Sequence, residues 1–289
     1  MIRNAMTVDV EDWFQVAAFF DHISRRDWAT LEYRAERNTD RVLEVFSRHG
    51  VIGTFFVLGW VAERSPELIR RIHAAGHEVA CHGMSHEFVY RQSPDVFREE
   101  TRRSKRIIED AIGAQVTGYR ASTYSITRQA LWALDILVDE GFQYDSSIFP
   151  VRHPQYGIPG ASREPGIMST PNGRSIVEFP LSTAKFGPVE LPVAGGGYFR
   201  ILPYWLTTAG LRSLNQREGR PFIFYFHPWE IDPGQPRVEH AKLSSRLRHY
   251  TNLSICEARL IRLLGDFQFT TVRDVLEGRG LLRRTSVAA

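Results

Sequence analysis

The strongest constraint on the fold is a regular alternation of short apolar runs with longer amphipathic segments. The longer segments carry apolar residues at intervals of three and four, and several open on Ser-Pro or close on Gly, which is typical of capped helices. Strands that alternate with helices in this way predict a parallel sheet covered by helices. The predicted strands are residues 5–10, 53–60, 77–83, 116–121, 142–147, 175–181 and 221–227, and the predicted helices are residues 39–50, 65–76, 93–113, 127–141, 203–219 and 253–267.

The composition changes between about residues 150 and 200. This stretch is rich in Pro and Gly, as in PQYGIPG and AGGGYF, and it contains one predicted strand. The strand-helix alternation then resumes. We therefore interpret residues 1–289 as a single domain with an insertion at about 150–200 and a C-terminal helix-strand extension at about 235–289, rather than as two domains.

Charge and composition exclude several classes of partner. The formal net charge is +3, and cationic clusters such as residues 101–106 alternate with acidic residues, so we expect no nucleic-acid partner. No apolar run approaches the roughly 20 residues of a membrane span, and the N-terminus lacks the apolar core of a signal peptide. Cys81 and Cys256 are the only cysteines, and this low number favours reduced thiols in a reducing compartment. We therefore expect a cytoplasmic protein without an integral membrane segment.

Ionisable side chains follow nearly every predicted strand. Parallel α/β folds carry their chemistry at the carboxyl ends of the strands, so these side chains are expected to converge on one site. The candidates, in chain order, are Asp9, Glu11, Asp12, His82, His86, Arg120, Ser122, Tyr124, Asp145, His227 and Trp229.

His82 and His86 form a candidate metal site. A catalytic zinc takes about three protein ligands from His and carboxylate and keeps one position open. Glu11 or Asp12 could supply the carboxylate, and strand alternation places Asp9 and Glu11 on one face. The same residues could instead bond backbone groups or cap a helix. We interpret the pattern as a divalent-metal site with Zn²⁺ as the expected ion.

Three further sets of candidate residues could act in catalysis or binding, or could have only a structural role. His227 emerges from the apolar run FIFYF, and a pKa of about 6.5 suits a proton donor, although a buried core histidine fits the same pattern. Arg120 and Asp145 could form an ion pair that orients a base, or one that only stabilises the fold. Tyr124 and Trp229 could stack on a sugar ring or cover the core.

Five segments in order, TVDVEDWF, CHGMSHEF, GYRASTYSI, QYDSSIFP and FYFHPWEID, resemble the motifs of polysaccharide deacetylases of the NodB-homology type, carbohydrate esterase family four. The resemblance spans residues 5 to about 235 and is greatest to the branch encoded in exopolysaccharide loci beside PEP-CTERM protein sorting. The expected fold is a distorted (β/α) barrel of about seven parallel strands with a Pro/Gly-rich insertion.

The resemblance implies roles for individual residues. The commoner first motif has two adjacent aspartates, whereas Val10 follows Asp9 here, so the carboxylate ligand moves to Glu11 or Asp12, with Glu11 favoured by strand alternation. Ser122 and Thr123 replace the usual Pro of the third motif, which bears on substrate choice more than on reaction type. The implied roles are general base for Asp9, metal ligands for His82 and His86, general acid for His227, tuning of the base for Arg120, and an oxyanion-binding backbone N–H near Tyr124.

The expected function is a metal-dependent hydrolase that removes N-acetyl groups from an amino-sugar polysaccharide or its oligosaccharide precursor, in exopolysaccharide biosynthesis. The expected partner is therefore an N-acetylated glycan, bound by Ser122, Tyr124 and Trp229. With no signal peptide visible, a lipid-linked or soluble internal precursor is the expected form, and the protein could associate with a membrane. The alternatives are an amidohydrolase of the same fold acting on a small non-sugar amide or cyclic imide, and a catalytically silent carbohydrate-binding protein.

Overall fold

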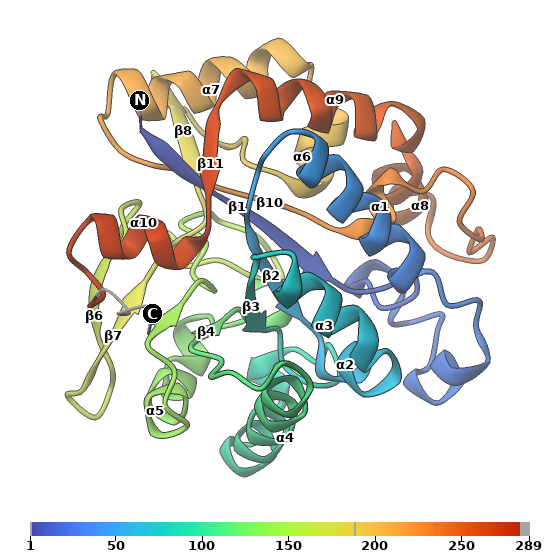
Figure 1. The fold of residues 1–289 in the computed structure, drawn as a ribbon, viewed down its shortest axis with the longest axis horizontal. Coiled ribbons are helices and arrows are strands. Elements are labelled where there is room, and N and C mark those ends of the chain that lie inside the picture. Colours follow the sequence, from blue (N-terminus) through green and yellow to red (C-terminus); the bar gives the residue numbers. More distant parts are fainter. Residues whose placement is uncertain (1, 188, 284–289) are drawn as a thin grey trace.

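A largely parallel sheet organises the chain (Figure 1). The computed structural model describes residues 2–187 and 189–283. Seven strands run parallel in the order β10-β1-β2-β3-β4-β5-β7, with β6 antiparallel at the β7 edge, while β11 pairs with the start of β1 and β8 pairs with β9 in a separate hairpin. The strands are β1 Arg3–Val10, β2 Thr54–Val57, β3 Glu78–Cys81, β4 Gly118–Tyr119, β5 Tyr144–Asp145, β6 Gly166–Ser169, β7 Ser175–Glu178, β8 Thr183–Phe186, β9 Val189–Pro192, β10 Ile223–Phe226 and β11 Gln268–Thr270.

The prediction of about seven parallel strands is confirmed, but strand pairing does not close the sheet within the described residues. Irregular segments lie beside β10 instead of a strand. The Ser182 hydroxyl accepts the Ile223 N–H at 2.9 Å, and the Ala194 carbonyl accepts the Tyr225 N–H at 3.0 Å. These bonds give two backbone N–H groups at the free edge of β10 an acceptor without a neighbouring strand.

Helices surround the sheet in Figure 1, and the predicted long helices are all present. α2, α6, α8 and α10 were not predicted from the sequence, because six to eight residues are too few to show a clear apolar period. The predicted insertion forms β6 to β9 and α6, and Met1, Pro188 and residues 284–289 of the predicted C-terminal extension lie outside the described residues. The helices are α1 Ala35–Arg48, α2 Gly59–Arg64, α3 Pro66–Ala74, α4 Pro94–Ile112, α5 Trp132–Asp139, α6 Gly196–Ile201, α7 Tyr204–Gln216, α8 Leu243–Tyr250, α9 Leu253–Asp266 and α10 Val272–Gly278.

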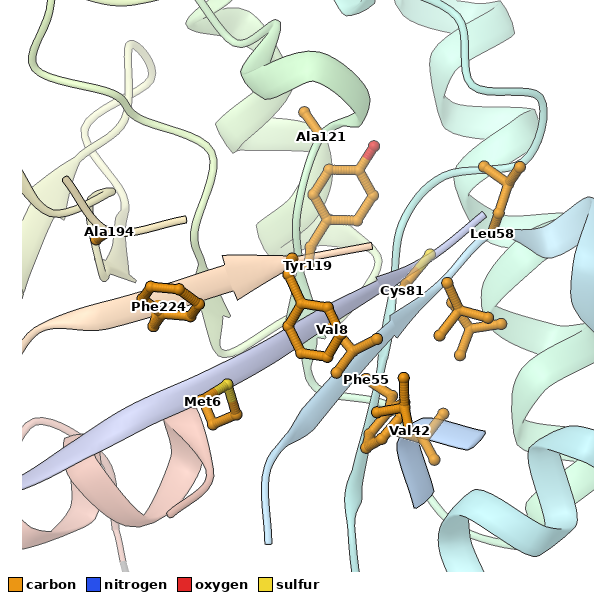
Figure 2. Close-up of a cluster of buried hydrophobic side chains, with 14 of the residues drawn as sticks. Met6, Val8, Val42, Phe55, Leu58, Cys81, Tyr119, Ala121, Ala194 and Phe224 are labelled. Carbon is orange, nitrogen blue, oxygen red and sulfur yellow. The ribbon is translucent and has the colours of Figure 1, made fainter. Parts of the chain in front are cut away.

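The two faces of β1 have different roles. Met6 and Val8 join the apolar cluster between the strands and the helices, where Figure 2 shows them with Phe55 of β2 and Phe224 of β10. Ala5 faces the other way, into a second cluster within the sheet. The alternation along β1 thus directs polar residues of its carboxyl end toward the inner side.

Two further properties of the described residues concern the cysteines and the length of apolar helices. Cys81 and Cys256 are both buried and free. The described part of the chain has no helix that is both long and apolar enough to cross a bilayer.

Candidate active site

A cavity of about 220 Å³ lies where the carboxyl ends of the parallel strands meet. It draws its lining from β1, from the loops after β3, β4 and β10, and from α6 and α8. The sequence-predicted residues in this lining are Asp9, Glu11, His82, His86, Tyr124, His227 and Trp229.

Three buried side chains present a group of possible metal donors. Glu11, His82 and His86 each offer one ligand atom, and these atoms lie within 4.8 Å of one another. The Nδ1 of His82 lies 2.8 Å from the Arg120 carbonyl oxygen, so Nδ1 carries the hydrogen and Nε2 is left as the acceptor. Burial lowers the pKa of His82 to about 4, which keeps the imidazole neutral as a metal ligand must be.

The unsatisfied polar atoms in this group fit a divalent cation. Oε2 of Glu11 is buried and has no hydrogen-bond partner among the described residues, although Nε2 of His86 contacts it. Burial by itself would raise the pKa of Glu11, but His86, His227 and His82 outweigh it and hold the pKa well below its ordinary value. A buried carboxylate with two imidazoles is a ligand set that zinc enzymes use with an open fourth position.

Asp9 is held by a buried arginine. Oδ1 of Asp9 accepts a hydrogen bond from Nη1 of Arg120 at 2.7 Å, and both side chains are buried. The Tyr124 hydroxyl donates to Oδ2 of Asp9 at 3.3 Å. Arg120 also donates to the Thr7 hydroxyl at 2.7 Å and to the Ser146 carbonyl at 3.2 Å. The guanidinium therefore fixes one carboxylate oxygen of Asp9 while the other faces the cavity.

His227 stands across the cavity and is oriented by a carboxylate three residues later. Its Nδ1 lies 2.7 Å from Oε1 of Glu230, and its Nε2 lies 3.9 Å from Oδ2 of Asp9 and 3.7 Å from Oε1 of Glu11. Burial lowers the pKa of His227, but Glu11, Glu230 and Asp9 outweigh it and raise the pKa to about 9 in the metal-free protein. The imidazole can thus carry a proton at neutral pH.

Glu230 is a residue that sequence reasoning missed. It is fully buried, and its Oε2 accepts a hydrogen bond from Nε of Arg200 on α6 at 2.5 Å. Arg200 in turn donates to the carbonyl of His249 at 2.7 Å. Its signal in the sequence was a Glu three residues after the His that follows an apolar strand, and His227 and Glu230 form a capping box in the structure.

Trp229 does not offer a free ring face to a substrate. Its ring is stacked between His227, at 5.1 Å between centroids, and His249, at 4.3 Å. Its indole N–H donates to Oε1 of Glu11 at 3.1 Å. The residue therefore positions Glu11 and His227, and the predicted stacking on a sugar ring has no exposed surface to act through.

Asp12 lies apart from the donor group and caps a helix. Its Oδ2 accepts the backbone N–H groups of Arg34, at 2.6 Å, and Ala35, at 2.8 Å, which begin α1, and its Oδ1 accepts the N–H of Trp13 at 2.8 Å. Glu11 is thus the carboxylate that the structure brings to the two histidines, and Asp12 takes the capping role that the sequence left open.

Replacing Asp12 with Ala is expected to lower the free energy of unfolding by about 3 kcal/mol, because three buried N–H groups lose their acceptor. The metal content per folded molecule should be unchanged. Urea denaturation followed by tryptophan fluorescence, with metal analysis of the folded protein, measures both quantities. Loss of metal at unchanged stability would contradict this role.

Ser122 and Asp145 are also outside the cavity lining. The Ser122 hydroxyl donates to the His82 carbonyl at 3.0 Å, so it supports the end of β3. Asp145 accepts a hydrogen bond from Ser147 at 2.5 Å and lies opposite Glu178 of β7. Burial raises the pKa of Asp145 to about 6. The described residues contain no ion pair between Asp145 and Arg120, because the guanidinium is engaged by Asp9 and Ser146.

Backbone strain concentrates at the cavity. Among the described residues, the non-glycine positions with positive φ are His86, Thr123, Tyr124 and Asn252, and the first three line the cavity. Such conformations cost about 1 kcal/mol or more and persist where the surroundings enforce them. The N–H of Tyr124 is already bonded to the Ala121 carbonyl at 3.0 Å, so its contribution to the cavity is its phenol.

Two family models match the chain: "Polysaccharide deacetylase" over residues 15–138 and "Domain of unknown function (DUF3473)" over residues 146–277. The chain is 37% identical over 99 residues to a chitooligosaccharide deacetylase of Bradyrhizobium sp. (strain ANU 289), which is 34% of this chain and 43% of that protein. It is 30% identical over 154 residues to a chitooligosaccharide deacetylase of Rhizobium leguminosarum bv. trifolii, which is 53% of this chain and 63% of that protein. Either match spans less than two thirds of the relative's length.

The fold has a close counterpart among solved structures. The crystal structure of a "putative polysaccharide deacetylase" from Mycobacterium smegmatis superposes with a TM-score of 0.60 at 24% identity, covering 99% of this chain and 93% of that one. The structural match covers both segments that the family models divide. Residues 15–138 thus match a polysaccharide deacetylase domain, the NodB type of carbohydrate esterase family four.

Proposed function

We propose that the protein is a metal-dependent N-deacetylase acting on an N-acetylated amino-sugar glycan. One observation carries the proposal: the Glu11–His82–His86 donor group lies in the same cavity as a base candidate and an acid candidate on separate strand ends. The motif resemblance extends the proposal to an exopolysaccharide or its precursor as the glycan.

Glu11, His82 and His86 would hold the cation, with Zn²⁺ as the expected ion. A divalent cation supplies Lewis-acid polarisation of the acetyl carbonyl and lowers the pKa of the attacking water. Asp9 accepts the proton of that water through Oδ2, the oxygen that faces the cavity, while Arg120 keeps the carboxylate in place.

His227 completes the reaction on the leaving group. An amine leaves an acylated carbon readily only when its nitrogen is protonated, and Nε2 of His227 is the donor that faces the cavity. Glu230 accepts the Nδ1–H of His227, which fixes the tautomer and supports the positive charge. Bond cleavage then releases acetate and the free amino sugar.

The test is release of acetate from chitooligosaccharides by the metal-loaded protein, with small cyclic amides and imides assayed in parallel. We expect acetate release and a matching gain of free amine. Turnover of a cyclic imide alone would instead identify the amidohydrolase alternative. Glycan binding without any turnover would identify a silent carbohydrate-binding protein.

Replacing Glu230 with Gln is expected to lower kcat for amide substrates by about 10- to 100-fold, because the carboxylate no longer orients and charges His227. Aryl acetates should lose less than about threefold, since a phenolate leaves without protonation. Comparing chitooligosaccharide with 4-nitrophenyl acetate measures this split. An equal loss on both substrates would indicate a merely structural role for Glu230.

We also propose that the chain works as one domain. The metal donors and Asp9 come from the N-terminal half, whereas His227, Trp229 and Arg200 come from the segment matched by the second family model. Neither half contains the full set of proposed catalytic groups, so both are required for turnover.

A further inference from the structure

The segment of residues 236–250, which ends in α8, carries an excess of unpaired positive charge. Its one acidic residue is Glu239. On α4, by contrast, Arg98 and Arg102 pair with Glu140 at 3.1 and 2.9 Å. The four cations of the segment form no ion pair with any described residue, and they are Arg237, Lys242, Arg246 and Arg248.

The same helix exposes two large apolar side chains. Leu243 is 68% exposed and Leu247 is 60% exposed. They are four residues apart, so they lie on one face of α8, while the buried His249 fixes the opposite face against the protein. Exposed leucines scattered singly are common, but here two adjoin on one helix turn beside unpaired cations.

One residue of this α8 face, Arg248, contributes to the lining of the candidate cavity, as does Ile201 at the end of α6, which is 48% exposed. α6 packs against α8. Exposed apolar and cationic groups of α6 and α8 therefore lie beside the cavity.

We propose that this α8 face, made of Lys242, Leu243, Arg246, Leu247 and Arg248, docks on an anionic lipid membrane. Short amphipathic helices bind lipid surfaces when apolar side chains enter the acyl boundary while neighbouring cations contact anionic headgroups. The exposed leucines and the unpaired cations supply these two interactions together. An acidic protein would neutralise the cations but has no particular need for the adjacent leucines, so charge and apolar exposure together favour lipid.

The docking has a consequence that rests on the proposed function. A membrane against α8 would place the cavity rim at the lipid surface, where a glycan attached to a lipid carrier would be presented. Docking itself needs no catalytic activity, so its failure and the failure of the deacetylase proposal can be told apart.

The test is co-sedimentation of the full chain with vesicles of phosphatidylcholine, with or without phosphatidylglycerol. We expect binding to the anionic vesicles that weakens steeply as salt rises, and far weaker binding to the neutral ones. The double variant Leu243→Ser/Leu247→Ser should lower partitioning by at least about tenfold, and Lys242→Glu/Arg246→Glu by a similar factor.

A matched control removes exposed apolar groups elsewhere. Ile167 on β6 is 71% exposed and Val189 on β9 is 51% exposed, and Ile167→Ser/Val189→Ser should bind vesicles like the unaltered chain. Circular dichroism and acetate release from a soluble oligosaccharide check that the leucine variant is folded. Absence of binding to anionic vesicles, or equal binding by the leucine variant and the control, overturns the proposal. An acidic protein partner would then be the remaining occupant.

Discussion

Replacing Asp9 with Asn is expected to reduce kcat for acetate release by roughly 10³-fold, with bound metal unchanged. The amide cannot accept the proton of the attacking water, yet it has nearly the volume of the carboxylate. Oδ1 of Asp9 is not among the donor atoms of the metal group, so the metal site should persist. Steady-state kinetics and metal analysis on the same preparation measure both outcomes.

The control for Asp9→Asn must separate chemistry from stability. Arg120 is fully buried, and its charge loses its partner in this variant, so some loss of stability is expected as well. Asp12→Asn provides a matched change at a residue outside the cavity lining and the metal-donor group, because Asp12 is equally buried but its side chain accepts only backbone N–H groups. Activity per folded molecule should stay near that of the unaltered chain in Asp12→Asn. Comparable losses in the two variants would remove Asp9 from its role as base.

Replacing His82 with Ala is expected to abolish both stoichiometric metal and turnover. A site with three protein ligands loses a third of its donors, and the Arg120 carbonyl that His82 now bonds is left without that partner. Metal titration should show an affinity lower by more than about 100-fold, and added Zn²⁺ should not restore the rate of the unaltered chain.

Exposed histidines allow a direct control for this variant. His73 on α3 is exposed and lies in no donor group among the described residues, so His73→Ala should retain metal and activity. Chelation of the unaltered protein should reproduce the loss seen in His82→Ala, and metal should reverse it. Full acetate release by His82→Ala would contradict the assignment of this metal centre.

Much of the fold was predictable because its information is local. Apolar runs of four to eight residues and amphipathic segments identify the strands and the long helices, and strand-helix alternation implies a parallel sheet. That topology brings the carboxyl ends of distant strands together, which is why the sequence alone assigns His82, His86, Glu11, Asp9 and His227 to one site.

Other assignments depended on contacts between segments far apart in the chain. Strand alternation favoured Glu11 over Asp12 as the metal ligand, but only the packing of α1 shows that Asp12 is used by the N–H groups of Arg34 and Ala35. Similarly, Asp9 and Asp145 both lie at strand ends and could each have paired with Arg120. The arrangement of the strands in the sheet brings Arg120 to Asp9 rather than to Asp145.

The sequence by itself determined the order of strands and helices, the chemical types gathered at the strand ends, and therefore the class of site. The tertiary structure decided which of those groups face the cavity, which ones stack against each other, as Trp229 does between His227 and His249, and that Arg200 from α6 supports Glu230. The physical reason is that periodicity and residue type are properties of neighbours along the chain. A buried hydrogen bond or ion pair, by contrast, is fixed by the relative placement of elements that the chain order does not specify.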